Sequence, residues 1–160
     1  MLFNSLVVSS IYAIDQASKR KIEEIPDDEP KVEYLGGHIG IEKYHNTGLA
    51  FNFLEKDGKL PLIFSSVALF ILGCAKLISH IGGRKKTTVT GAGLSFILGG
   101  ALGNVRDRQK KGYVTDFITF PKAPTEYLRN MHFNIADFAI FFGVILTIIG
   151  ALGGDDKTKQ

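Results

Sequence analysis

The chain has 160 residues, a length suited to one domain, with 45% hydrophobic and 22% charged residues. Its formal net charge of +3 is small and shows no clustered basic face, which argues against nucleic-acid binding. The single cysteine excludes an intrachain disulfide, and the histidines lack metal-ligand spacing, so neither a metal site nor a cofactor is predicted.

The charged residues are unevenly distributed along the chain. Nearly half of the sequence lies in four apolar blocks, and these contain only Asp15, Lys76 and Asp137 among the charged residue types. Each block is about as long as the roughly 17 to 25 apolar residues that cross a bilayer. We therefore predict a mainly α integral membrane protein with four transmembrane helices, forming one polytopic domain over residues 1–160. The predicted spans cover about 2–18, 60–81, 88–106 and 133–152.

The first block is interpreted as a retained helix, because Asp15 and Lys19 occupy positions where a signal-peptide cleavage site needs small neutral residues. Residues 22–59 follow it as a polar segment. Within that segment, the stretches 32–35 and 39–44 alternate with a period close to two, which predicts two or three short strands in an extramembrane β element.

The second and third blocks are joined by a short basic loop. Residues 82–87 contain three basic and no acidic side chains, which places this loop and both chain termini in the cytoplasm. Basic residues also follow the first block on the opposite side, but long or structured loops count weakly in this rule. Near the inner end of the second block, Lys76 is expected to extend its ammonium group to the lipid headgroups.

Polar side chains gather where the predicted spans meet the outer membrane face. Asn134 and Asp137 are three residues apart at the start of the last block and so share one helix face. Carboxylates at such positions usually pair, face a cavity or take part in function. Further polar residues fall at the same face: Asp15, Lys19, Asn46, Asn104, Asp107, Arg108 and Asp116.

Two carboxylates within hydrogen-bond reach share one proton near neutral pH, because both cannot ionise cheaply. The ionised member can take a proton from water while the protonated member polarises a carbonyl and later protonates the leaving amine. This chemistry is that of aspartic proteolysis. Arg108 and the Asn side chains are suited to orienting a substrate backbone or a lipid headgroup, and Asp107 is a possible ion-pair partner of Arg108.

Five motifs resemble, in order and spacing, those of the bacterial lipoprotein signal peptidases, known as signal peptidase II. With the spans between them, the resemblance covers nearly the whole chain. The motifs are DQASK at 15–19, NTGLAF at 46–51, GGALGNVRDR at 99–108, GYVTDF at 112–117 and FNIAD at 133–137.

The resemblance implies an aspartic endopeptidase that removes the signal peptide from diacylglyceryl-modified prolipoproteins, cutting before the lipidated Cys. It places the catalytic dyad on Asp116 and Asp137. The implied substrate-binding residues are Asn46, Asn104, Arg108 and Asn134, and the implied supporting residues are Asp15, Lys19 and Asp107.

The family resemblance also implies location and partners. It implies a multi-pass protein of the bacterial cytoplasmic (inner) membrane, with its active site near the extracytoplasmic face and inhibition by globomycin. A β-sheet cradle is expected over about 22–59 and a short amphipathic helix over 124–131. The expected partners are prolipoproteins and membrane lipids, with no nucleic acid, and the expected state is a monomer.

Two other functions are open at this point. A catalytically inactive relative that binds lipoprotein or lipid would lack one of the motif Asp or Asn residues. A small proton-coupled carrier would use Asp15 and Asp137 as relay groups and would spread its carboxylates across membrane depth. The acidic cluster at 27–29 has no role in the resemblance, so the preferred precursors are not predicted.

Overall fold

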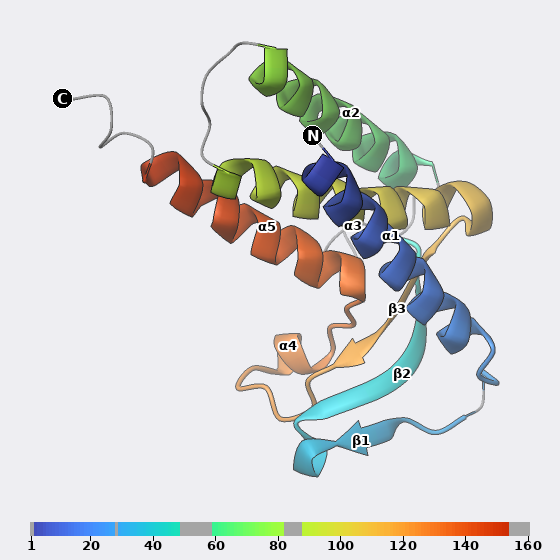
Figure 1. The fold of residues 1–160 in the computed structure, drawn as a ribbon. Coiled ribbons are helices and arrows are strands. Elements are labelled where there is room, and N and C mark those ends of the chain that lie inside the picture. The colour runs from blue at the N-terminus through green and yellow to red at the C-terminus, as the bar shows by residue number, and fades with distance from the viewer. Residues whose placement is uncertain (1, 28, 49–58, 82–87, 154–160) are drawn as a thin grey trace.

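A computed structural model of the chain describes residues 2–27, 29–48, 59–81 and 88–153. The described chain is mostly helical, with a small three-stranded antiparallel sheet at one end of the helices (Figure 1). Its long helices are α1 (Leu2–Glu23), α2 (Leu60–Ile81), α3 (Thr88–Lys111) and α5 (Ile135–Leu152). The remaining elements are β1 (Val32–Tyr34), the 3-10 helix η1 (Leu35–Gly37), β2 (Ile39–Asn46), β3 (Val114–Thr119) and α4 (Glu126–Arg129).

The outward-facing surfaces of the long helices are strongly apolar. On α2 and α5, Phe70 and Phe141 are about two-thirds exposed or more, at 72% and 68%. Large apolar side chains exposed in such numbers indicate a surface that contacts lipid or another protein. By length and composition, α5 is the one described helix that could cross a membrane, and Leu60–Cys74 is a shorter apolar helix. The four-span arrangement therefore stays a prediction.

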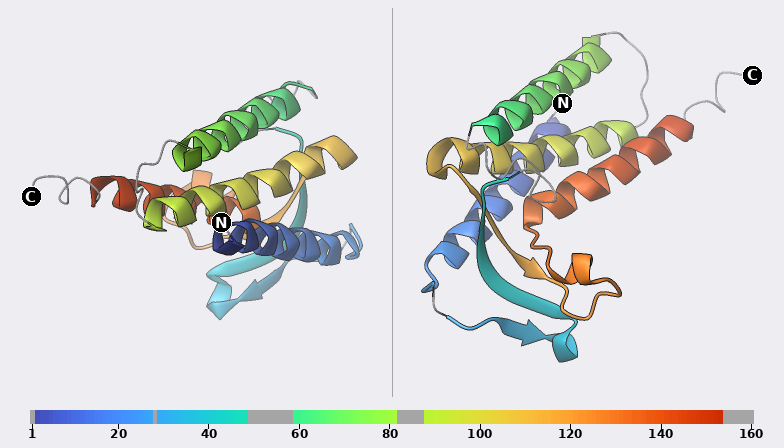
Figure 2. Two further views of the ribbon diagram at one scale, coloured as in Figure 1. Left: turned by 45° about the horizontal axis from the view of Figure 1, so that its top comes forward. Right: turned by 180° about the vertical axis from the view of Figure 1, so that it is seen from behind.

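Helix α3 lies between α2 and the neighbouring helices α1 and α5 (Figure 2). Glycines on α3 and α5 allow the two backbones to approach closely. A Cβ atom on Gly93 would lie 2.5 Å from the Thr147 Oγ1 atom, and one on Gly143 would lie 2.6 Å from the Gly93 carbonyl oxygen. Small residues at such crossings permit van der Waals packing between membrane helices, and here they bring α3 and α5 into backbone contact.

Lys76 differs from its predicted behaviour. Its Nζ atom donates to the Ser95 hydroxyl at 2.6 Å and to the Gly91 carbonyl at 3.1 Å, both on α3. The expectation that this ammonium group extends away to the headgroups is wrong, because the neighbouring helix supplies two acceptors within reach. A lysine surrounded by apolar residues is held by such acceptors.

The sheet has the strand order β1-β2-β3 with antiparallel pairing throughout. Residues 39–46 form the central strand, and the register between β2 and β3 pairs Asn46 with Val114 and Tyr44 with Asp116. The strands predicted within 22–59 are present, but the third strand, β3, comes from the stretch after α3, for which no strand was predicted. A short helix, α4, lies within the predicted stretch 124–131.

Candidate active site

The start of α5 fixes two of the predicted site residues. Asn134 is the N-cap, and its side-chain oxygen accepts a hydrogen bond from the Asp137 backbone N–H at 3.0 Å. The Asp137 carboxylate in turn accepts from the Asn134 backbone N–H at 3.0 Å. This reciprocal capping box satisfies donors that the first helical turn leaves free. It also holds the Asp137 carboxylate in one orientation at the helix terminus.

Asp116 reaches the same place from the sheet. Its side chain is 2% exposed and accepts hydrogen bonds from Asn134 Nδ2 at 2.5 Å and from Asn46 Nδ2 at 2.9 Å. Asn134 therefore contacts both Asp116 and Asp137. A strand, its neighbouring strand and the start of a helix thus bring the two predicted catalytic carboxylates to one cluster.

Asn104 links this cluster to α3. Its Nδ2 atom donates to the Asp137 carboxylate at 2.9 Å, while its side-chain oxygen accepts from Asn134 at 3.1 Å and from Lys19 Nζ at 2.8 Å. The Asn104 amide nitrogen thus donates to the Asp137 carboxylate, and its oxygen accepts from the Lys19 ammonium group. Such a fully paired polar network is rigid, because each member restricts the orientation of the next.

A buried ion cluster lies behind Asn104. Lys19 is 1% exposed, and its Nζ atom lies 2.9 Å from Asp15 Oδ2 and 3.1 Å from Asp107 Oδ2. The other Asp15 oxygen accepts from the Ala136 backbone N–H at 3.0 Å. Buried charges are tolerated when they are paired. Asp15 therefore anchors the first turn of the helix that carries Asp137.

Arg108 contacts the turn that follows β2. Its Nη2 atom donates to the Gly48 carbonyl at 2.7 Å, and the Gly48 backbone N–H donates to the Asn46 side chain at 2.9 Å. Asp107 pairs with Lys19 and, at 3.4 Å, with Lys111. The predicted Arg108–Asp107 ion pair is therefore wrong for the described residues, because consecutive helical side chains point in different directions.

The environment of Asp116 changes its acidity. Burial is the largest cause and the negative charge of Asp137 is the second, and together they raise the pKa of Asp116 to about 7. The hydrogen bonds from Asn46 and Asn134 act in the opposite direction but are weaker. A carboxyl group with this pKa exchanges its proton near neutral pH, as general acid–base catalysis requires.

The sequence model of the signal peptidase (SPase) II family matches residues 7–153. The chain belongs to the signal peptidase II family.

Individual relatives of this chain support its assignment to the signal peptidase II family. The lipoprotein signal peptidase of Alteromonas mediterranea is 39% identical over 93% of this chain and 80% of its own length. That of Enterococcus faecalis is 34% identical over 97% of this chain and 91% of its own length. These matches identify a bacterial membrane peptidase.

Two solved structures, each described as a bacterial membrane enzyme, share the fold of this signal peptidase II chain. One, at 2.3 Å resolution, has a TM-score of 0.80 and 28% identity, covering 100% of this chain and 93% of its own. The other, at 1.9 Å resolution, has a TM-score of 0.78 and 27% identity, covering 95% of this chain and 94% of its own. The likeness extends over both the helices and the sheet.

The signal peptidase II chain also contains a second polar cluster that the sequence reasoning missed. The Glu23 carboxylate lies 3.1 Å from Lys111 Nζ and 3.2 Å from His45 Nε2, and it accepts from the Thr115 hydroxyl. The His45 ring stacks on Tyr113 with centroids 4.0 Å apart. The sequence does offer one indication of this cluster: His45 and Thr115 directly precede the predicted site residues Asn46 and Asp116. This cluster joins the end of α1 to the strands that carry the site.

Within the described ranges, no three or more His, Cys, Asp or Glu side chains are placed to hold a metal ion. Of the predicted site residues, Asp15, Lys19, Asn46, Asn104, Asp107, Asp116, Asn134 and Asp137 form one connected network. Arg108 joins it through the Gly48 turn.

Proposed function

We propose that this chain is an aspartic endopeptidase that removes the signal peptide from diacylglyceryl-modified prolipoproteins, with Asp116 and Asp137 as the catalytic dyad. The observation that carries the proposal is the shared Asn134 side chain, which donates to Asp116 and caps Asp137. This arrangement keeps two carboxyl groups together where water is largely excluded. Under those conditions the pair holds one proton between them.

The reaction follows from this shared proton. The ionised carboxylate takes a proton from a water molecule, whose oxygen attacks the carbonyl carbon of the scissile peptide bond. The protonated carboxyl group donates a hydrogen bond to the carbonyl oxygen as negative charge develops there. When the C–N bond breaks, a carboxyl group transfers its proton to the leaving amine, and the dyad returns to its starting charge.

The neighbouring polar residues position the dyad and the substrate. Asn46 and Asn104 donate to Asp116 and Asp137 respectively, so neither carboxylate is free to rotate. Arg108 holds the turn after β2 and is suited to contact substrate carbonyls or a headgroup phosphate, since its guanidinium has several donors. Asp15, Lys19 and Asp107 support the site through the start of α5 and through Asn104.

The proposed membrane placement has α1, α2, α3 and α5 crossing the bacterial cytoplasmic membrane, with both termini in the cytoplasm. The sheet then lies at the extracytoplasmic end, next to the dyad. This places the scissile bond at the membrane surface, where the diacylglyceryl group of a modified Cys can remain in the lipid while the peptide bond before it enters the site. Globomycin is expected to inhibit by occupying the dyad.

The two other functions are less well supported. An inactive relative would lack a dyad residue or its amide partners, and all of these are present and hydrogen-bonded. A proton-coupled carrier needs titratable groups at several depths, whereas Asp15 and Asp137 lie at the same end of the helix bundle. Both observations favour the peptidase.

The test of the dyad is substitution of either member by its amide. Asp116→Asn and Asp137→Asn should each lower cleavage by at least about 100-fold, because neither amide can transfer the proton. Cleavage is measured as the gel shift of a purified prolipoprotein carrying a diacylglyceryl-modified Cys, with globomycin as the inhibited reference.

The matched control is Asp27→Asn, because the Asp27 carboxylate is 86% exposed and pairs with Lys43 away from the dyad. This variant should cleave at the wild-type rate. Membrane insertion of all three variants is checked by their recovery in the membrane fraction. Near-normal turnover by either dyad variant, with insertion intact, would remove the assignment.

A further inference from the structure

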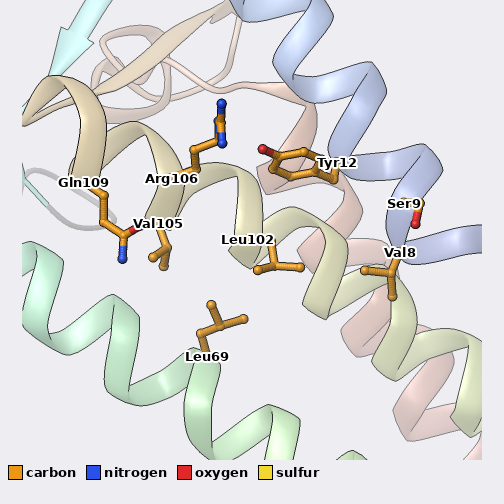
Figure 3. Close-up of a pocket in the computed structure, with 8 residues that line it drawn as sticks. All are labelled: Val8, Ser9, Tyr12, Leu69, Leu102, Val105, Arg106 and Gln109. Atoms are coloured by element: carbon orange, nitrogen blue, oxygen red, sulfur yellow. The ribbon is translucent and has the colours of Figure 1, made fainter. Parts of the chain in front are cut away.

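A cavity lies outside the candidate active site, between α1, α2 and α3. Its volume is about 400 Å³. Figure 3 shows Leu69 of α2 facing Leu102 and Val105 of α3, with α1 at the far side. The eight residues that line it are Val8, Ser9, Tyr12, Leu69, Leu102, Val105, Arg106 and Gln109.

The lining is apolar at one end and polar at the other. Helices α1 and α3 run side by side in the same direction, since Ile11 packs on Gly99 and Lys19 pairs with Asp107. In this register Arg106 lies closer to the sheet than Tyr12, and its guanidinium carbon lies 5.9 Å from the centre of the Tyr12 ring. Val8 lies one helical turn further from the sheet than Tyr12, and Leu102 lies one turn further from it than Arg106. In the proposed orientation, the polar end is at headgroup depth and the apolar end faces the bilayer interior.

Arg106 has no acidic partner in the described part of the chain. Its side chain is exposed, and no described carboxylate lies within 4.0 Å of it, whereas Asp107 is buried on the α1 side. An arginine in this position brings a permanent positive charge and a planar set of donors suited to a phosphate. Gln109, one turn away, adds an amide donor at the same end.

We infer that this cavity binds one anionic phospholipid, with the headgroup phosphate against Arg106 and one acyl chain against Val8, Leu69 and Leu102. Charge complementarity selects an anionic lipid over a zwitterionic one, and the apolar wall selects a lipid over a soluble phosphate. The inference uses the membrane orientation proposed above but not the catalytic dyad. None of the residues that line the cavity belongs to the hydrogen-bonded network of the dyad, so it is a separate site.

The binding test uses the full-length protein in detergent, examined by native mass spectrometry. Phosphatidylglycerol and phosphatidylcholine with identical acyl chains are added at equal concentration. The wild type should retain phosphatidylglycerol in preference. Arg106→Gln should weaken phosphatidylglycerol binding by about tenfold, the scale of a charge-assisted hydrogen bond, and should reduce the preference for phosphatidylglycerol over phosphatidylcholine.

Two further variants make the test specific. Lys110→Gln removes an exposed charge from the same helix outside the cavity and should leave lipid binding unchanged. Leu102→Trp fills the apolar end and should reduce the binding of both lipids. Prolipoprotein cleavage in detergent should stay at the wild-type rate in Arg106→Gln, which separates this site from the dyad.

Several outcomes would overturn the inference. The first is equal retention of the two lipids by the wild type, and the second is unchanged phosphatidylglycerol binding in Arg106→Gln. The third is a loss of phosphatidylglycerol binding in Lys110→Gln as large as that in Arg106→Gln, which would indicate diffuse attraction to a basic surface. If Arg106→Gln folds poorly, judged by its melting temperature, the wild-type preference and Leu102→Trp decide the question. Loss of cleavage in the dyad variants with lipid binding intact would leave both proposals standing independently.

Discussion

Asn134 shows how much of the site depends on a single side chain. Its oxygen accepts from the Asp137 backbone N–H, and its amide nitrogen donates to Asp116 and to Asn104. An asparagine amide has two N–H donors and one oxygen, so every group is used. The same contacts fix which way the amide points. No aspartate could replace it without losing both donated bonds and adding a third carboxyl group to the cluster.

The raised pKa of Asp116 predicts that the folded protein is less stable at alkaline pH. Between the ordinary value of 3.8 and the folded value of about 7, the folded state binds more protons at this group than the unfolded state. Stability therefore falls as pH rises through this window, and the loss is complete above it. Asp116→Asn cannot ionise, so it should raise the melting temperature in detergent by a few degrees at pH 8.5 and by less at pH 5.

The matched control for this pH effect is Asp27→Asn. The Lys43 ammonium group lowers the pKa of Asp27, so that replacement should give no gain at pH 8.5. Melting is followed by intrinsic tyrosine fluorescence or by differential scanning calorimetry in one detergent. A gain for Asp116→Asn that is the same at both pH values would contradict the titration as its cause.

At the scale of elements, the crossing of α3 and α5 sets where Asp137 lies. Gly93→Ala should destabilise the protein by about 1–3 kcal/mol, because the added methyl group meets the Thr147 side chain and the Gly143 backbone. The cost should appear as a lower melting temperature and as reduced cleavage, since the start of α5 shifts with the crossing.

Gly73→Ala on α2 is the matched control for the helix crossing. A Cβ atom there meets nothing within 4 Å, so this substitution should be neutral or slightly stabilising through the better helix propensity of Ala. Equal melting temperatures for Gly93→Ala and the wild type would show that the crossing can widen without cost.

The helices were largely predictable from the sequence, and their ends were not. The apolar runs give α2 and α5 directly. Helix α1 continues to Glu23 beyond the predicted end near residue 18, and α3 continues to Lys111 beyond residue 106. In both cases the helix continues through charged residues that lie beyond the predicted span. Lys19 and Asp107 pair with each other inside the helical bundle.

Strand β3 was missed for a related reason. Half-buried strands alternate between apolar and polar side chains, but in Val114–Thr119 five of the six residues are buried, Thr115 and Asp116 among them. Because both faces of this strand are buried, its sequence lacks the alternation of apolar and polar residues that indicates a strand. The polar residues on this strand are satisfied by partners distant in sequence, such as Asn134 and Glu23.

At the scale of the whole molecule, the proposed topology can be tested by labelling. In a Cys74→Ser background, Glu126→Cys should react with a membrane-impermeant maleimide in intact spheroplasts, because the proposed topology has α4 on the extracytoplasmic side. Lys85→Cys, in the basic loop at 82–87, should react only after lysis. A reversed pattern would invert the orientation and place the dyad at the cytoplasmic face.

The sequence by itself determined which residues are polar within apolar blocks and which family motifs they form. Those features predicted a membrane peptidase with Asp116 and Asp137 at one end of a helical bundle, because uncharged runs and fixed spacings are local properties. Only the tertiary structure decided that Asn134 joins the two carboxylates, that Lys19 and Asp15 support the start of α5, and that Asp116 titrates near neutral pH. These are contacts between distant segments, and burial, the main cause of the pKa shift, exists only once the helices and the sheet have packed.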